Sequence, residues 1–243
     1  MTDGRYVYCI VENNATGDLG NIGLYDSSVY RIPYKNICAL VSTIPFKEIH
    51  PSVNEIISHQ RVVEASRERW TTLPVRFGTL FKSDDGVKEF LTRSYKELHP
   101  KIEKFKDKEE YGLKVIIDKS DLRKLDLKID DNEEIKQIKE ELKGAGEGTS
   151  YFLKMKMDEA MKTEMLKKID EISGDIHQNL SKVSATSCTL RSDITEILLN
   201  SSYLIDRNEK SKFDSQVHKI KKKYEPIGIT LHVSGPWAPY SFC

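Results

Sequence analysis

The sequence contains few cysteines, and none of them lies near another. The 243-residue chain has four, without C-x-x-C spacing or a histidine pair close by: Cys9, Cys38, Cys188 and Cys243. Zinc sites show clustered cysteine and histidine, and disulfide frameworks are typical of short secreted chains. We therefore expect reduced thiols in a cytosolic protein, three of them as small apolar residues of strands, and no metal or cofactor.

Long apolar runs and an excess of one charge are also missing. No window approaches the roughly 20 apolar residues that a membrane-spanning helix needs. Residues 1–5 lead directly into a short apolar stretch, without the basic region or the cleavage site of a secretory signal. The 38 Lys and Arg residues balance 38 Asp and Glu residues. We therefore expect neither a membrane nor a nucleic-acid partner.

The spacings of known catalytic and metal motifs do not occur. The six histidines lack H-x-x-x-H and H-E-x-x-H spacing, so all are interpreted as surface or hydrogen-bonded structural groups: His50, His59, His99, His177, His218 and His232. The carboxylate pairs Asp84-Asp85 and Asp130-Asp131 each stand just before a predicted helix, where capping and the helix dipole explain them. Residues 144–148 lack the Lys-Ser/Thr pair of a phosphate-binding loop, so they are interpreted as a flexible link. An enzyme is not predicted.

The residues that are present predict a folded α+β protein of two domains. Charged residues make up 31% of the chain and apolar residues 38%, which is typical of a globular protein. Strands are predicted first, at residues 6–11, 22–25, 28–32 and 37–44. A helix from Val53 to about Trp70 follows, with Ser52 and Glu55 as a capping box. A second helix begins after Gly86, and Pro100 is expected to kink or end it.

The second half of the chain predicts a different domain. A strand at 111–117 precedes a charged helix around residues 135–142 and a long helix with apolar residues at three- and four-residue steps from Met161 to Val183. Residues 151–157 alternate with a period of two, so they are left open between helix and strand. A hairpin (186–191 and 197–205), a helix (213–224) and a strand (229–233) follow. With the charged helix and the glycine link taken as an insertion in the first crossover, this is the βαββαβ order of a ferredoxin-like domain. We therefore expect domains at 1–106 and 107–234 and an extended aromatic tail at 235–243.

Two stretches are not explained by these elements. In residues 73–81, Pro74, Arg76 and Gly78 interrupt an apolar strand, and we leave open whether this is a functional segment or a core strand whose arginine pairs with an acidic neighbour. In the last residues, two prolines exclude a regular helix. The aromatic residues of this tail either pack back on their own domain or dock on a partner.

Basic residues point only weakly to RNA. The one dense cluster, Lys219 with Lys221–Lys223, falls in the last turn of a predicted helix, where the helix dipole favours cations. The predicted strand 197–205, which would carry RNA-stacking aromatics, has Tyr203 alone. An RNA- or small-ligand-binding ferredoxin-like module stays an alternative, as does an unrecognised enzyme.

Several segments, in order along essentially the whole chain, resemble the gas vesicle protein L / gas vesicle protein F family. The most specific are L-P-V-R-F-G-T at 73–79 and G-P-W-x-P-Y-S-F at 235–242. Further similar stretches lie at 6–11, 39–42 and 200–205. The lysine-rich residues 118–143 have no clear counterpart.

This resemblance implies a non-enzymatic accessory protein of gas vesicle assembly, a monomer located in the cytoplasm and at the gas vesicle. It implies an α+β N-terminal domain followed by a modified ferredoxin-like domain. Its expected partners are the very apolar shell protein (gas vesicle protein A) and other accessory proteins, met during vesicle nucleation or growth. The motif residues are the candidate interface: Pro74, Arg76, Phe77, Gly78, Thr79, Tyr203, Gly235, Pro236, Trp237, Pro239, Tyr240 and Phe242.

Overall fold

The computed structural model describes residues 2–14, 16–117, 132–194 and 196–243. Helices and two sheets give it the predicted α+β class. The predicted Asp130-Asp131 pair lies outside the described residues. Contacts divide the chain into two compact units, which we describe separately. Unit 1 contains Met1–Tyr111, Leu204–Asn208 and Ser234–Cys243, and unit 2 contains Gly112–Tyr203 and Glu209–Val233.

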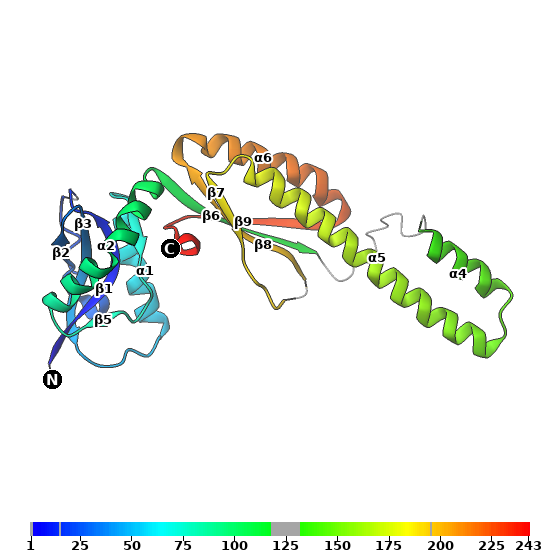
Figure 1. Ribbon diagram of the computed structural model, residues 1–243, viewed down its shortest axis with the longest axis horizontal. Coiled ribbons are helices and arrows are strands. Elements are labelled where there is room, and N and C mark those ends of the chain that lie inside the picture. Colours follow the sequence, from blue (N-terminus) through cyan, green and yellow to red (C-terminus); the bar gives the residue numbers. More distant parts are fainter. Residues whose placement is uncertain (1, 15, 118–131, 195) are drawn as a thin grey trace. The chain divides into compact units, whose positions relative to one another are not determined.

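Unit 1 is built on an antiparallel sheet in the order β2-β3-β1-β4 (Figure 1). The long central strands β1 (Asp3–Glu12) and β3 (Ile37–Pro45) contain the apolar runs predicted as strands. The shorter strands are β2 (Tyr30–Tyr34), β4 (Thr72–Pro74) and β5 (Leu80–Phe81), and β5 also pairs with β1. Residues 73–81, predicted as extended, are thus two short strands with a turn between them.

A β-bulge in β1 decides which side chains face each side of this sheet. Val7 pairs with Val41 and Cys9 with Leu40, so Tyr8 is the extra residue. Alternation restarts after the bulge. Tyr6, Tyr8, Cys9 and Val11 therefore join one buried cluster, while Val7 and Ile10 join the other.

Each face of the sheet is covered by one helix. Val62 and Val63 of α1 (Val53–Arg67) pack in the cluster of Tyr6 and Tyr8. Val87, Leu91, Ile102 and Phe105 of α2 (Asp84–Phe105) pack in the cluster of Val7 and Ile10. Two helices over two faces give unit 1 a layered core, typical of mixed folds.

The ends of these helices correct two predictions. The Ser52 hydroxyl bonds the Glu55 carboxylate and caps no backbone amide, so the capping box does not form. At α2 the cap is Ser83, whose Oγ accepts from the Gly86 amide at 3.2 Å. Pro100 neither ends nor breaks α2, which continues to Phe105. Pro100 is exposed, so water can reach the carbonyl that its missing amide leaves free.

One predicted strand of unit 1 is wrong. Residues 22–25 were expected to be extended, but Leu24–Asp26 form a short 3-10 turn in which Tyr25 has a φ of 57°. The Leu24 amide donates to the Tyr8 hydroxyl (2.8 Å), and the Ser27 hydroxyl donates to the Leu24 carbonyl (2.6 Å). These bonds satisfy the backbone locally, so the segment does not need a sheet partner.

Unit 2 takes most of its residues from the second half of the chain. Its sheet order is β7-β8-β6-β9, with β6 at Lys108–Ile117, β7 at Thr186–Thr189, β8 at Ile197–Asp206 and β9 at Ile229–Trp237 (Figure 1). The predicted hairpin is confirmed, because β7 pairs with β8. Strands β6, β8 and β9 have residues in both units.

The helices of unit 2 are α4 (Glu133–Lys143), α5 (Glu147–Ser181) and α6 (Lys210–Tyr224). Residues 151–157, left open from the sequence, are helical. Ile172, Ile176 and Leu180 of α5 are buried, whereas Met161, predicted in the same apolar stripe, is 39% exposed. Among the described residues, no helix is long and apolar enough to cross a membrane.

Candidate functional site

Unit 1 carries an open, mostly apolar groove of about 660 Å³. Three segments of the chain line it: α1, residues 74–77 and the C-terminal tail (residues 235–243). The lining residues are Ile56, His59, Gln60, Pro74, Val75, Arg76, Phe77, Trp237, Tyr240 and Cys243. The two motifs that stood out separately in the sequence therefore meet in one place.

The wall formed by residues 74–79 is fixed by its backbone. The Val75 amide donates to the Tyr8 carbonyl at 3.0 Å, which continues the pairing of β4 with β1. After it comes a turn in which the Thr79 amide and hydroxyl donate to the Arg76 carbonyl at 3.3 and 2.7 Å. Gly78 has a φ of +84° in this turn, a conformation that glycine adopts at little cost. The motif thus encodes a strand end and a tight turn.

His59 forms the floor of the groove and connects α1 to this turn. Its ring is only 5% exposed and lies 5.7 Å from the ring of Phe77. The Tyr6 hydroxyl accepts from the Gly78 amide at 3.2 Å and donates to His59 Nδ1 at 2.8 Å. Burial lowers the pKa of His59 to about 4, partly opposed by a hydrogen bond to the Val75 backbone. His59 is therefore a neutral structural group at pH 7.

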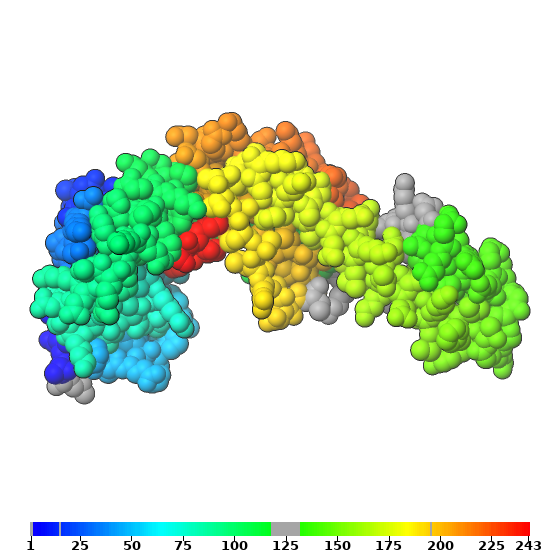
Figure 2. All heavy atoms as spheres, viewed as in Figure 1, coloured from blue at the N-terminus to red at the C-terminus, as the bar shows by residue number. Residues whose placement is uncertain are grey.

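The C-terminal tail forms the third wall, and it is anchored within unit 1. Ala238 is fully buried in the same cluster as Tyr6 and Tyr8. The carboxylate of Glu110, itself only 5% exposed, accepts from the Ser241 amide (2.9 Å) and the Ser241 hydroxyl (2.6 Å). Figure 2 shows the tail in red. It packs on its own chain, extended to Trp237 and ending in a 3-10 turn at Tyr240–Phe242.

Gly235 is the residue that turns the chain into this tail. Its φ is +109°, and a Cβ here would lie 2.7 Å from the Glu110 carbonyl oxygen. Both the backbone and the neighbouring atom therefore exclude a side chain.

We expect the Gly235→Ala substitution to lower the free energy of unfolding by about 2 kcal/mol, because a strained backbone conformation of this kind costs roughly 1–3 kcal/mol. Urea unfolding measures this loss. Gly174→Ala is the matched control, because Gly174 lies within α5 with no neighbour in reach of a new Cβ and alanine favours a helix. Equal stability of the two variants would contradict the conclusion that position 235 requires glycine.

Three titratable side chains of the groove, those of His59, Tyr240 and Cys243, are held in their neutral forms. Desolvation raises the pKa of the Tyr240 phenol, and the nearby carboxylate of Glu64 adds to the shift. Desolvation also raises the pKa of the Cys243 thiol to about 12. With His59 neutral as well, none of these three is poised near pH 7 as a catalytic base or nucleophile usually is. Within the described ranges, no group of three or more Cys, His, Asp or Glu residues is arranged to hold a metal ion.

A second, smaller cavity of about 310 Å³ in unit 1 has a polar lining. Arg67 and Arg207 contribute to it, but both are engaged with neighbouring carboxylates. Arg67 pairs with Glu64 at 2.8 Å and with Glu109 at 2.6 Å, and Arg207 approaches Glu109 at 3.4 Å. Internal pairing explains these arginines, so we regard the apolar groove as the stronger candidate.

Known proteins match nearly the whole chain, including the segments that line this groove. The sequence model described as gas vesicle synthesis protein GvpL/GvpF matches residues 4–243. The chain belongs to the GvpL/GvpF family. The resemblance read from the sequence motifs is thereby confirmed.

Individual relatives of this GvpL/GvpF family member match over nearly their whole length. Gas vesicle protein F of Streptomyces sp. is 26% identical over 240 residues, covering 98% of each chain. Gas vesicle protein L of Haloferax mediterranei is 22% identical, covering 100% of this chain and 88% of the relative. The crystal structure of GvpF from Anabaena sp. has a TM-score of 0.85 at 22% identity, covering 99% of this chain and 98% of its own, so the two share a fold. GvpF from Microcystis aeruginosa gives 0.76 at 20% identity, covering 98% of both.

The structure brings most, but not all, of the predicted motif residues of this family member to the groove. Pro74, Arg76, Phe77, Trp237 and Tyr240 line it directly. Gly78 and Thr79 form the turn beside it, and four others belong to the tail itself: Gly235, Pro236, Pro239 and Phe242. Of these, Pro239 is buried and Phe242 packs against the cluster on the α2 side of the sheet.

Tyr203 has a different position from the other motif residues. It belongs to unit 2, is fully buried and does not line the groove. Its hydroxyl lies 3.0 Å from His177 Nδ1 and 3.1 Å from Ser201 Oγ, and its ring packs against Phe213. These contacts give Tyr203 a role in the core of unit 2.

Three residues that shape the site are among those not singled out from the sequence. Ile56 is an exposed apolar residue on α1, and nothing local distinguishes it from its neighbours. Glu110 lies among other charged residues just after the predicted domain boundary, and nothing in the sequence marks it as buried. His59 was interpreted as one of the surface or structural histidines, and its hydrogen bond to Tyr6 agrees with a structural role. Each becomes recognisable only when distant segments are brought together.

Proposed function

We propose that this protein is a non-enzymatic accessory protein that binds the hydrophobic shell protein, gas vesicle protein A, and other accessory proteins during vesicle nucleation or growth. Membership of the GvpL/GvpF family supports involvement in gas vesicle assembly and association with gas vesicle proteins. The proposal that it binds the shell protein rests on the convergence of two family motifs on one open apolar groove.

The groove has the properties of a docking surface for an apolar segment. Ile56 and Tyr240 in its walls are 46% and 43% exposed, which leaves apolar area in contact with water. Exposed apolar clefts of this kind mark binding sites, and burying them on a partner is favourable. An apolar shell subunit is a partner of matching chemistry.

The neutral forms of His59, Tyr240 and Cys243 support a binding role over an enzymatic one. An active site usually holds its acid, base or nucleophile at a pKa near the working pH. Here desolvation moves each pKa away from neutrality. The RNA-binding alternative needs exposed aromatics on the inner strands of the sheet in unit 2, and Tyr203 on β8 is fully buried.

We also propose that residues 107–234 form a modified ferredoxin-like domain, following an N-terminal α+β domain at 1–106. In support, the first and third strands of the predicted order, β6 and β8, are the central strands of the sheet β7-β8-β6-β9. The paired helices α4 and α5 then occupy the first crossover. Folding of a fragment containing only residues 107–234 would test this division.

The groove proposal predicts the effect of changing its exposed walls. We expect Ile56→Gln combined with Tyr240→Ala to weaken binding to the shell protein by about tenfold or more, because the loss of one good interface anchor costs over 1 kcal/mol. Pull-down with purified shell protein, quantified over a concentration series, measures this effect.

Ile57→Gln is the matched control, because Ile57 is a 48% exposed α1 residue outside the groove lining. Its binding should equal that of the unchanged protein. Undiminished binding by the folded double variant would contradict the groove as the docking site. In a host that makes gas vesicles, the double variant should also fail to restore buoyant vesicles after deletion of the native gene.

A further inference from the structure

Arg76 is the only charged side chain among the residues that line the groove. It is exposed, and its guanidinium has no hydrogen bond or ion pair with any described residue. The sequence left open that this arginine pairs with an acidic neighbour, and within the described chain that pairing does not occur.

Three other arginines of unit 1 form ion pairs with carboxylates of the same chain. Arg5 pairs with Asp84, Arg67 with Glu64 and Glu109, and Arg93 with Glu89. Each of these has a carboxylate from its own chain within 4.0 Å. Arg61, also exposed, likewise has no ion pair with a described residue, but it does not line the groove. Arg76 is thus a guanidinium at the edge of an apolar groove with no carboxylate side chain among the groove residues.

The position of Arg76 is fixed even though its side chain is free. Its carbonyl accepts two bonds from Thr79, at 2.7 and 3.3 Å, and the amide of the preceding Val75 bonds β1. The following residue, Phe77, packs its ring 6.1 Å from Tyr6 and 5.7 Å from His59. Residues on both sides are held, so the cation is presented at a defined place on the groove wall.

An apolar partner that fills the groove removes water from this guanidinium. Covering a charge without a counter-charge is costly, and a paired, hydrogen-bonded charge avoids most of that cost. Carboxylates match the planar fork of arginine with two parallel hydrogen bonds. A segment that binds in the groove therefore needs apolar side chains and also a carboxylate positioned to meet the Arg76 guanidinium.

We infer that the segment that docks in the groove is an apolar stretch of the shell protein carrying one aspartate or glutamate, which pairs with the Arg76 guanidinium. This inference rests on the proposed function and specifies the recognition chemistry of the same groove. Arg76 sets the register of the docked segment, while Ile56 and Tyr240 supply the apolar contact.

The test uses overlapping synthetic peptides that span the shell protein, titrated against the full chain and its Arg76 variants. We expect Arg76→Gln to weaken the bound peptide about tenfold and Arg76→Glu to weaken it further, because charge reversal adds repulsion. Arg76→Lys should bind between the unchanged protein and Arg76→Gln. Salt should weaken binding to the unchanged protein more than binding to Arg76→Gln.

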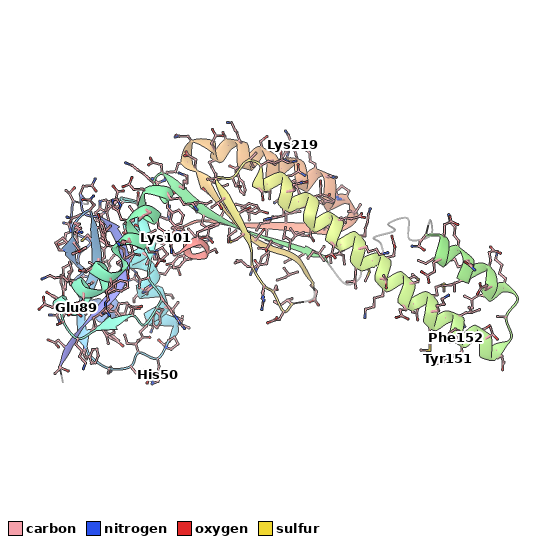
Figure 3. The ribbon with its side chains drawn as sticks, in the orientation of Figure 1. His50, Glu89, Lys101, Tyr151, Phe152 and Lys219 are labelled. Carbon is pink, nitrogen blue, oxygen red and sulfur yellow. The ribbon has the colours of Figure 1, made fainter. Side chains whose placement is uncertain are left out.

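Arg93→Gln is the control, because Arg93 is an exposed arginine of α2 outside the groove lining, one helical turn from Glu89, which Figure 3 labels. Its affinity should not change. Changing the acidic residue of the bound peptide to lysine should restore binding to Arg76→Glu, which a loss through misfolding would not allow.

The outcomes separate this inference from the proposed function. Loss of binding in the Ile56 and Tyr240 variant, with full affinity and unchanged salt dependence in Arg76→Glu, would overturn the carboxylate pairing alone. No peptide bound by any form of the protein would overturn both. A dimer in sedimentation that Arg76→Glu dissociates would show that a second copy of the chain occupies the groove, and would also overturn the inference.

Discussion

Replacing His59 by glutamine should make the stability of the protein less sensitive to acid. Between about pH 6.5 and about pH 4, the free energy of unfolding should fall by about 3 kcal/mol more in the unchanged protein than in His59→Gln. The pKa of His59 is about 4 in the folded protein and 6.5 without the fold, because burial disfavours its charged form. Between these values the unfolded state binds the proton and the folded state does not. The contribution of neutral His59 is therefore complete above pH 6.5 and is lost as the pH falls.

Urea unfolding at several pH values measures this effect as a difference between variants. Carboxylates also titrate over the same range, but they do so equally in both proteins. At about pH 5 the unchanged protein should already have lost about 2 kcal/mol more than His59→Gln, by the same linkage. His50→Gln is the control, since His50, labelled in Figure 3, is exposed in the loop before α1 and should leave the pH dependence intact. If the free energy of unfolding changed with pH in the same way in His59→Gln and in the unchanged protein, the lowered pKa of His59 would be refuted.

Local patterns predicted most of the secondary structure of this chain. The apolar runs of β1 and β3 and the apolar spacing of α6 are properties of consecutive residues, so they can be read directly. Residues 22–25 look like a strand for the same reason. Their backbone bonds, however, are satisfied by Ser27 and by Tyr8, a residue of another segment. Contacts at that separation leave no local pattern.

The start of α5 shows a second limit of pattern reading. Tyr151, Leu153, Met155 and Met157 alternate as a strand would, but only Leu153 is buried. Tyr151 and Met155 are 70% and 56% exposed, and Figure 3 labels Tyr151 on α5. A period of two carries information only when the apolar residues face a core.

The candidate site was predictable as motifs but not as a groove. Pro74 and Gly78 mark a strand end and a turn, and Pro236 and Pro239 mark an irregular tail. The sequence does not show that both segments approach α1, because that depends on Glu110 and Ala238, which hold the tail within unit 1. That the guanidinium of Arg76 has no carboxylate partner is likewise visible only once the carboxylates of the described residues have been placed.

Replacing Glu110 by alanine should lower the free energy of unfolding by about 4 kcal/mol and release the C-terminal tail. Glu110 is buried, and its carboxylate accepts from both the amide and the hydroxyl of Ser241. Hydrogen bonds to charged groups contribute roughly 1.5–3 kcal/mol each, and the two donors would be left without their acceptor. Glu110→Gln keeps one acceptor oxygen, so it should lose about half as much.

Chemical unfolding measures the change in stability, and the fluorescence of Trp237 reports the tail, because its indole lies in the groove wall. In Glu110→Ala that emission should shift to longer wavelength before global unfolding. Glu89→Ala, on the exposed surface of α2 where Glu89 pairs with Arg93, should change neither quantity. The same loss of the tail removes one wall of the groove, so Glu110→Ala should also weaken binding to the shell protein while Glu89→Ala does not. A stable Glu110→Ala variant with unchanged Trp237 emission would show that the tail is held by its apolar contacts, with Ala238 as its main anchor.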